Sequence, residues 1–126
     1  MRYYFLELLV CPICKKPDLV LHVISERSAE VNVEVEKLKC RQVCGLYGKR
    51  ASEVPIEECR KCAHREIEEG VLICKECGRW YPIVDGIPHM LPDKYRIKRV
   101  DEEFIKRNRD KLPEDILRLM KIPEIV

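Results

Sequence analysis

The stretch GVLICKECGRWYPIVDG, residues 70–86, contains the elements that decide the fold of this chain. GVLIC is a short apolar run bounded by turn signals, which predicts a strand. Cys74 and Cys77 then flank two charged residues, and RWYPIV after them predicts a second extended segment. The dipeptide Asp85-Gly86 closes the stretch with a turn signal. The sequence therefore predicts two strands joined by a tight turn that carries two cysteines.

The turn CKECG, residues 74–78, has the form of a zinc knuckle, in which two thiolates approach one metal ion to about 2.3 Å. Gly78 can adopt the positive φ that such turns often need. The motif CPICK, residues 11–15, has the same spacing near the N-terminus. Both motifs end a ribbon half, so we expect one structural zinc site with the ligands Cys11, Cys14, Cys74 and Cys77. Four cysteine ligands leave no open position for substrate, which argues against a catalytic zinc.

Two further cysteine pairs lie in residues 36–66: Cys40 with Cys44, and Cys59 with Cys62. The first pair has the i, i+4 spacing that places two side chains on one face of a helix. The second pair would form a third knuckle. Together they predict either a second four-cysteine zinc site, which we favour, or two disulfides, which require the cytosol of a hyperthermophile. A segment with few large apolar residues needs either a metal ion or disulfides to stabilise it. His64 is a spare candidate ligand, although a solvent-facing role is the simpler interpretation.

The segments before residue 36 are mostly extended. Residues 3–10, YYFLELLV, predict a short helix that enters the first cysteine turn. Residues 18–24 and 29–35 alternate apolar and polar side chains, which is the period of a half-buried strand. Residues 25–28 are the expected turn between these two strands.

The pattern after residue 36 becomes helical. Apolar residues at helical spacing in 36–50 predict one helix, and Pro55 begins a second helical stretch that extends to Glu69. Pro82 lacks an N–H, so its strand should be an edge strand or carry a bulge. Pro113 begins a last short helix, because proline is favoured in the first turn.

These elements predict an α+β fold. It consists of a small zinc-ribbon sheet over residues 1–35 and 67–92, a helical insertion with cysteines over 36–66, and a charged helical tail over 93–126. The chain of 126 residues suits one such domain, and its 46% hydrophobic content allows a mostly aliphatic core.

The composition also bounds the function. The apolar N-terminus leads into CPIC rather than a cleavage site, and no apolar run reaches the roughly 18 residues that span a bilayer. We therefore expect a cytoplasmic protein that makes no membrane contact. The sequence has no Ser/His/Asp set, phosphate loop or paired-carboxylate motif, so we expect no enzyme activity of its own.

Residues 78–93, GRWYPIVDGIPHMLPD, carry few charges in a chain that is 37% charged. Trp80 and Tyr81 point to opposite faces of a regular strand, so a thin ribbon cannot bury every apolar side chain here. Pro82 and Pro88 fix an extended path but lack the N–H for pairing within the protein. Such a segment leaves an edge to which another chain can add a strand.

The candidate partner-binding residues are Trp80, Tyr81, Pro82, Ile83, Val84, Ile87, Pro88, His89, Met90 and Leu91. Aromatic residues and methionine are frequent anchors at interfaces. For Ile83, Val84 and Ile87, packing in a small core beside the zinc site explains the apolar character at least as well. His89 on its own is typical of a hydrogen-bonding surface residue rather than a catalyst.

Two blocks of the sequence, LELLVCPICKKPDLVL and EEGVLICKECGRWYPIVDGIPHMLPD, resemble the multifunctional methyltransferase activator subunit family. Its members are small zinc-ribbon partners of tRNA, ribosomal RNA and release-factor methyltransferases. The resemblance covers roughly half of the chain, and the block over residues 69–93 is its specific part. It leaves out the four insertion cysteines and the tail after Asp93.

The resemblance implies a non-catalytic subunit that stabilises class I methyltransferases and forms a heterodimer with them. S-adenosylmethionine is then bound by the partner enzyme and not by this chain. The resemblance also implies that the metal ligands are Cys11, Cys14, Cys74 and Cys77, and that the run Arg79–Leu91 contributes to the partner surface, partly by strand pairing. A contact with RNA is expected only through the partner.

A nucleic-acid-binding zinc ribbon is the alternative hypothesis. The net charge of +2 is too balanced to favour it by itself. Acidic residues interleave most of the basic ones, and the run Lys94–Arg99 is the best candidate for an RNA contact. The basic side chains available for it are Arg41, Lys49, Arg50, Arg60, Lys61, Arg65, Lys94, Arg96, Lys98 and Arg99.

Overall fold

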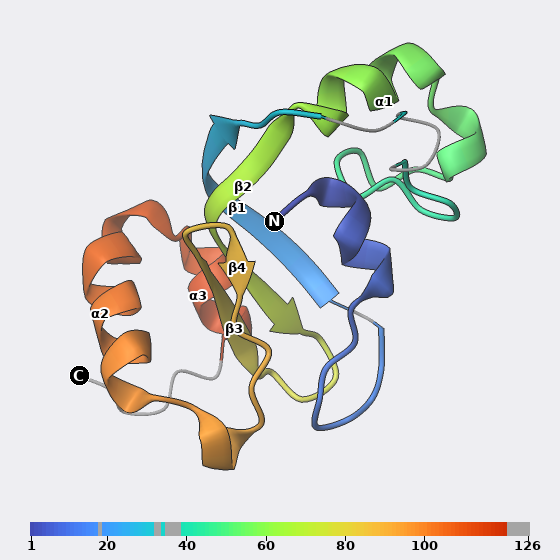
Figure 1. The fold of residues 1–126 in the computed structure, drawn as a ribbon. Coiled ribbons are helices and arrows are strands. Elements are labelled where there is room, and N and C mark those ends of the chain that lie inside the picture. Colours follow the sequence, from blue (N-terminus) through green and yellow to red (C-terminus); the bar gives the residue numbers. More distant parts are fainter. Residues whose placement is uncertain (18, 32–33, 35–38, 121–126) are drawn as a thin grey trace.

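A four-stranded antiparallel sheet lies at the centre of the protein (Figure 1). The structure is a computed structural model that describes residues 1–17, 19–31, 34 and 39–120. The strands lie in the order β1-β2-β3-β4 and span Leu19–Ser28, Arg65–Cys74, Trp80–Val84 and Ile87–Pro88. With helices on both faces, this sheet confirms the predicted α+β class.

Strands β1 and β2 pair along their whole length, from Leu19 opposite Cys74 to Ser28 opposite Arg65. The turn predicted at residues 25–28 is wrong, because β2 begins five residues earlier than expected and supplies partners for these residues. The strand predicted at 29–35 is not seen in the described residues 29–31 and 34, while 32, 33 and 35 lie outside the described residues. The chain therefore leaves the sheet after Ser28 and returns to it at Arg65, which lies opposite Ser28.

Strand β3 shows why a proline fits inside this sheet. Pro82 lies opposite Val71 of β2, while its carbonyl accepts a hydrogen bond from the His89 N–H on the other side at 2.9 Å. The N and C=O of one residue point the same way in a strand, so the missing N–H faces away from β2 and no bond to that strand is lost. The turn Asp85-Gly86 joins β3 to β4 with φ values of 50° and 78°, as predicted for a turn.

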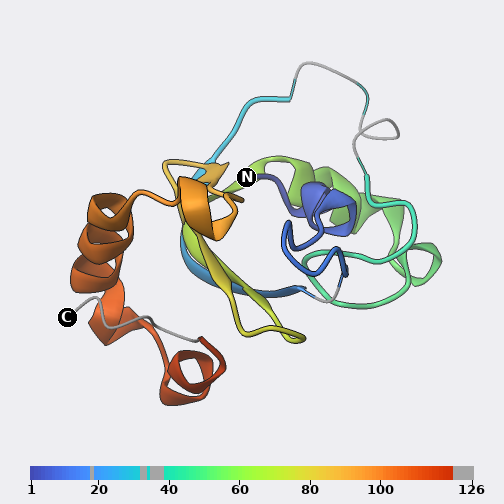
Figure 2. The same ribbon diagram turned by 90° about the horizontal axis from the view of Figure 1, so that it is seen from below.

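The two faces of the sheet carry separate apolar clusters. Figure 2 shows the N-terminal segment on one side of the sheet and the helices of the tail on the other. Tyr81, Leu72 and Ile67 point to one face, where the N-terminal segment covers them. Trp80 and Ile73 point to the other face, where they meet Phe104 of the tail. The opposite orientation of Trp80 and Tyr81 confirms the prediction from strand alternation.

The tail packs on the sheet through two helices, α2 (Lys98–Asn108) and α3 (Glu114–Leu119). The Phe104 and Trp80 rings stack at a centroid distance of 6.1 Å. Glu69 of β2 accepts hydrogen bonds from Arg107 at 2.7 Å and from the Asn108 amide at 3.1 Å. The helix predicted after Pro113 is confirmed as α3. The short 3₁₀ turns η4 (Asp93–Tyr95) and η5 (Arg109–Lys111) flank α2.

The insertion differs from its predicted form. Its helix α1 spans only Ile56–Ala63, because the chain enters β2 at Arg65 instead of continuing as a helix to residue 69. Residues 39–50, all of them described, form turns and a bridge between Val43 and Arg50 rather than the predicted helix. A 3₁₀ turn, η3 (Ala51–Glu53), leads into α1.

The N-terminal 3₁₀ helix η1 (Tyr3–Leu8) confirms the short helix predicted there and ties the insertion to the ribbon. The Glu7 carboxylate accepts hydrogen bonds from the main-chain N–H groups of Arg41, Gln42 and Val43, at 2.6, 2.9 and 3.1 Å. Gly45 lies against the Tyr3 carbonyl so closely that an added Cβ would come within 2.2 Å of the oxygen. The insertion is therefore docked on η1.

Candidate metal centre

Two matching turns build the ribbon metal site. In the first, the Cys11 N–H donates to the Lys16 carbonyl, and the Lys15 N–H donates to the Cys11 carbonyl. In the second, Cys74 bonds to Arg79 and Gly78 bonds back to Cys74 in the same pattern. The fifth residue of each turn has positive φ, 62° at Lys15 and 75° at Gly78. The sequence anticipated the glycine but not the strained lysine.

The four cysteines of these turns converge. The sulfurs of Cys11, Cys14, Cys74 and Cys77 all lie within 4.8 Å of one another. Cys11 Sγ is 3.7 Å from Cys77 Sγ, and Cys14 Sγ is 3.3 Å from Cys74 Sγ. Tetrahedral zinc with bonds of about 2.3 Å separates its sulfurs by about 3.8 Å. The donor set and its spacing therefore fit one four-coordinate zinc ion, as predicted.

The surroundings of the ribbon site shift the pKa values of Cys11 and Cys74 in opposite directions. Burial opposes ionisation of Cys11, but the Cys14 N–H, the Tyr81 hydroxyl and the Ile13 N–H outweigh it and lower the pKa of this thiol to about 6. The Tyr81 hydroxyl lies 3.1 Å from Cys11 Sγ. Burial raises the pKa of Cys74 to about 12, so without a metal Cys11 and Cys74 do not ionise together.

Two residues at this site were not assigned to it from the sequence. Tyr81 is buried with its hydroxyl on Cys11, and its ring belongs to the core beside the site. Arg79 forms an ion pair with Asp93 at 2.8 Å, and the Asp93 carboxylate together with the Cys77 thiol raises the pKa of its guanidinium. Alternation along β3 could have indicated Tyr81, but the position of Arg79 depends on the path of the tail.

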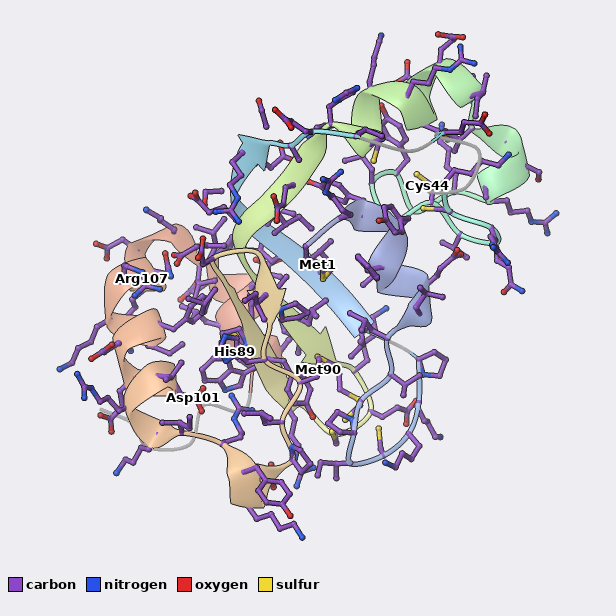
Figure 3. The ribbon with its side chains drawn as sticks, in the orientation of Figure 1. Met1, Cys44, His89, Met90, Asp101 and Arg107 are labelled. Carbon is purple, nitrogen blue, oxygen red and sulfur yellow. The ribbon has the colours of Figure 1, made fainter. Side chains whose placement is uncertain are left out.

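The two cysteine pairs of the insertion exchange their predicted structures: the pair expected in a turn lies on a helix, and the pair expected on a helix lies outside any helix. Cys59 and Cys62 lie on helix α1, three residues apart, instead of forming a knuckle. Cys44 instead begins a tight turn, and Cys40 precedes it outside any helix. All four line one cavity of about 20 Å³ together with Tyr4, Leu46 and Ala63. In Figure 3, side-chain sulfur atoms gather beside Cys44, far from Asp101 and Arg107 on α2.

The insertion thiols differ electrostatically from Cys11. Burial, with smaller contributions from the nearby thiols of Cys44, Cys40 and Cys59, raises the pKa of Cys62 to about 11. Burial likewise raises the pKa of Cys40 and of Cys59. His64 does not take part, because its side chain is exposed and its Nδ1 lies 3.2 Å from the Ala29 carbonyl.

The ten candidate partner-binding residues divide into a buried and an accessible group. The side chains of Trp80, Tyr81, Pro82 and Ile83 are buried in the two cores of this chain. Ile87 is exposed, with 61% of its surface accessible. The others, which are Val84, Pro88, His89, Met90 and Leu91, are partly exposed. Figure 3 places His89 and Met90 on the segment that follows β4. Whether any of the ten contacts a partner stays a prediction.

The basic residues offered for nucleic-acid binding are largely paired with carboxylates. Six of the ten lie within ion-pair distance of an acidic side chain, namely Arg60, Lys61, Arg65, Arg96, Lys98 and Arg99. Arg96 also donates to the Trp80 carbonyl and lies over the Trp80 ring. This pairing favours solvated or structural roles over a continuous phosphate-binding surface. None of the helices in the described residues is long and apolar enough to cross a membrane.

Comparison with known proteins extends these observations. The profile of the family described as Trm112p-like protein matches residues 2–86, which include both halves of the ribbon site and the insertion but not the tail. A UPF0434 protein from Methylobacillus flagellatus is 47% identical over 45 residues, which cover 36% of this chain and 75% of that protein. No solved structure matches the chain. The family match spans well over half of the chain and confirms the resemblance drawn from the sequence: this protein belongs to the Trm112p-like family.

Proposed function

We propose that this protein is a non-catalytic subunit that binds and stabilises class I S-adenosylmethionine-dependent methyltransferases acting on tRNA, ribosomal RNA or release factor. The observation that supports the proposal most directly is the family match over residues 2–86. The match includes the first sequence block that resembles methyltransferase activator subunits and residues 68–86 of the second. In this proposal the partner binds the methyl donor, and any RNA contact runs through the partner.

The chemistry of the ribbon site supports a structural role for the metal. Cys11, Cys14, Cys74 and Cys77 would hold one zinc ion with four thiolates, which fills its tetrahedral coordination. Cys11 and Cys74 are fully buried, whereas Cys14 and Cys77 are partly exposed, so the site lies at the edge of the core. Zinc at this site would fix the ends of β1, β2 and β3 relative to η1. It would therefore stabilise the fold rather than activate a substrate.

The edge beside β4 is the surface best suited to a partner strand. His89 directs its N–H toward β3, so strand alternation turns the N–H of Met90 outward. Within the described part of the chain, the Met90 N–H makes no backbone hydrogen bond. The exposed side chain of Ile87 adds apolar surface to the same edge. Strand addition here would use main-chain groups and would leave Trp80 and Tyr81 in their cores.

The cysteines support a cytoplasmic location. All eight are free thiols in the structure, and a reducing compartment maintains that state. A metal site with four thiolates is also stable there, because the metal protects its ligands. Location in the cytoplasm would give the protein access to the RNA and translation enzymes named above.

Co-expression with class I methyltransferases tests the proposal. We expect a stable heterodimer on gel filtration with at least one enzyme of tRNA, ribosomal RNA or release factor, and increased activity of that enzyme. Ile87→Glu places a charge on the proposed edge and should lower the affinity at least tenfold, whereas Leu119→Glu on α3 is a matched control at an exposed apolar residue. The absence of a heterodimer with every enzyme tested would overturn the proposal. Salt-dependent binding of RNA by the isolated protein would favour the nucleic-acid alternative.

A further inference from the structure

We propose that Cys40, Cys44, Cys59 and Cys62 form a second metal site, in the insertion, that binds zinc or another thiophilic divalent cation. This inference is independent of the methyltransferase role. It rests on three features of the described insertion: the turn at Cys44, the hydrogen bonds to two sulfurs, and a small cavity that all four thiols line.

The turn at Cys44 has the backbone of the two ribbon knuckles. The Cys44 N–H donates to the Lys49 carbonyl at 2.7 Å, and the Gly48 N–H donates to the Cys44 carbonyl at 2.8 Å. The corresponding bonds at Cys74 are both 2.8 Å. Gly48 has a φ of 72°, in the same position of the turn as Gly78 with 75°. The insertion therefore contains a third knuckle turn, with Tyr47 in the place of the second cysteine.

Main-chain N–H groups point at two of the insertion sulfurs. The Tyr47 N–H lies 3.4 Å from Cys44 Sγ, and the Gly45 N–H lies 3.4 Å from Cys40 Sγ. The bond at Cys44 has the same i+3 register as the bond from Cys14 N–H to Cys11 in the ribbon. A neutral thiol is a weak acceptor, whereas a metal-bound thiolate gains from such donors. The turn is thus arranged for an anionic sulfur.

Helix α1 supplies the other two ligands. Cys59 and Cys62 are three residues apart, so both project from one face of the helix toward the Cys44 turn. Tyr47 and Glu58 hold turn and helix together through a hydrogen bond of 2.9 Å between hydroxyl and carboxylate. The result is a site with two ligands from a turn segment and two from a helix.

The cavity between the four cysteines has room for one ion. Its volume of about 20 Å³ exceeds the roughly 10–15 Å³ that one water molecule requires. The insertion sulfurs are not gathered as closely as the ribbon sulfurs. Each cysteine has one side-chain torsion, so rotation of the thiols into the cavity can close the distance around a cation. Lys39 at the cavity offsets part of the thiolate charge.

A metal explains this arrangement better than disulfides do. In a disulfide the sulfur carries no charge, and the N–H groups aimed at Cys40 and Cys44 would gain little from it. All four cysteines are also separate thiols in the structure. Metal binding would release the thiol protons and crosslink the turn to α1, which a segment with a small core needs.

Native mass spectrometry of the full-length protein tests the proposal. The protein is purified under reducing, oxygen-free conditions and reconstituted with zinc chloride. We expect two zinc ions per chain. A single zinc with a mass lower by four hydrogens would show two disulfides and overturn the proposal. A single zinc with four thiols open to alkylation would overturn it as well.

Matched variants assign the ligands. Cys59→Ser combined with Cys62→Ser should retain one zinc, and a count that stays at two would overturn the proposal. Glu57→Gln changes an exposed residue of the same helix that does not line the cavity and should retain two zinc ions, whereas a drop to one would reject the four-thiolate assignment. Cobalt(II) titration gives a second readout, because the sulfur-to-metal absorption of the wild type should be twice that of the double variant. Protected amides in β2 and β3 would show that the ribbon of the variant remains folded.

Discussion

The ribbon site and the insertion cavity each contain four cysteines, but different structures hold them. In the ribbon, two knuckle turns sit at strand ends, and the sheet fixes all four sulfurs within 4.8 Å of one another. In the insertion, one knuckle turn faces a short helix, and a cavity separates the two. A knuckle backbone therefore orients a pair of ligands, whereas the supporting elements decide how far two pairs converge without a metal.

The largest effect should come from removing a ribbon ligand. Cys74 is fully buried at the end of β2, and serine is a poor zinc ligand there. Structural zinc contributes on the order of 10 kcal/mol, which is comparable with the whole stability of a small domain. We expect Cys74→Ser to unfold the sheet, and Cys59→Ser to alter only the insertion. Zinc content and amide exchange of β2 and β3 measure this, and a Cys74→Ser protein with a protected sheet would contradict it.

The next largest effect concerns the junction between the two regions. Gly45→Ala would bring a Cβ to within 2.2 Å of the Tyr3 carbonyl oxygen, and neither backbone can easily yield. Overpacking of this kind costs about 1–3 kcal/mol. We expect the insertion to detach from η1, with faster amide exchange in residues 39–63 and little change in β2 and β3. Equal acceleration in both regions would show that the insertion and ribbon unfold as one unit.

A smaller effect should depend on pH. Burial opposes ionisation of Glu7, but the N–H groups of Arg41, Gln42 and Val43 outweigh it and lower the pKa of this carboxyl. A lowered pKa stabilises docking above the unfolded value of about 4.3, and this stabilisation is lost as the pH falls through the folded pKa. Glu7→Gln should weaken the junction at pH 7 by about 1 kcal/mol and remove this acid dependence. Amide exchange of residues 41–43 between pH 3 and 7 measures both the weakening at pH 7 and the acid dependence. An exchange profile that is the same in the variant as in the wild type would exclude Glu7 as the cause of the acid dependence.

The smallest effects come from the positive-φ position of matching turns. Lys15 occupies it in the ribbon with a φ of 62°, and Gly48 occupies it in the insertion with 72°. Lys15→Gly should relieve strain and stabilise the zinc-loaded protein by up to about 1 kcal/mol. Gly48→Ala meets no neighbouring atom within 4 Å, so its cost should be conformational only and also about 1 kcal/mol. Urea denaturation of the zinc-loaded protein measures the change in the free energy of unfolding for both variants. A stabilising Gly48→Ala would refute the shared turn geometry.

The ribbon could be predicted because its signals are local. The spacing in CPICK and CKECG, the turn at Asp85-Gly86 and the alternation of Trp80 and Tyr81 depend on neighbouring residues, and the structure confirms them. The insertion could not be predicted in the same way. The i, i+4 spacing of Cys40 and Cys44 suggests a helix, but Gly45 and Gly48 allow a tight turn that Glu7 caps from η1.

The partner segment shows a second limit of local patterns. Trp80 was a candidate for a partner surface because a thin ribbon was not expected to bury every apolar side chain of this segment. The tail buries it, since Phe104 stacks on Trp80 across more than twenty intervening residues. Which side chains remain for a partner therefore depends on where α2 packs.

The sequence alone was enough to identify the family, the α+β class and the convergence of the four ribbon cysteines, because these follow from short spacings that fix turn geometry and strand alternation. Only the tertiary structure decided that Cys44 forms a knuckle turn, that Cys59 and Cys62 face it from a helix, and that α2 covers Trp80. These outcomes depend on contacts between segments far apart in the chain, such as η1 on the insertion and the tail on the sheet. Their free energies outweigh local helix and strand preferences, which are weak for short segments.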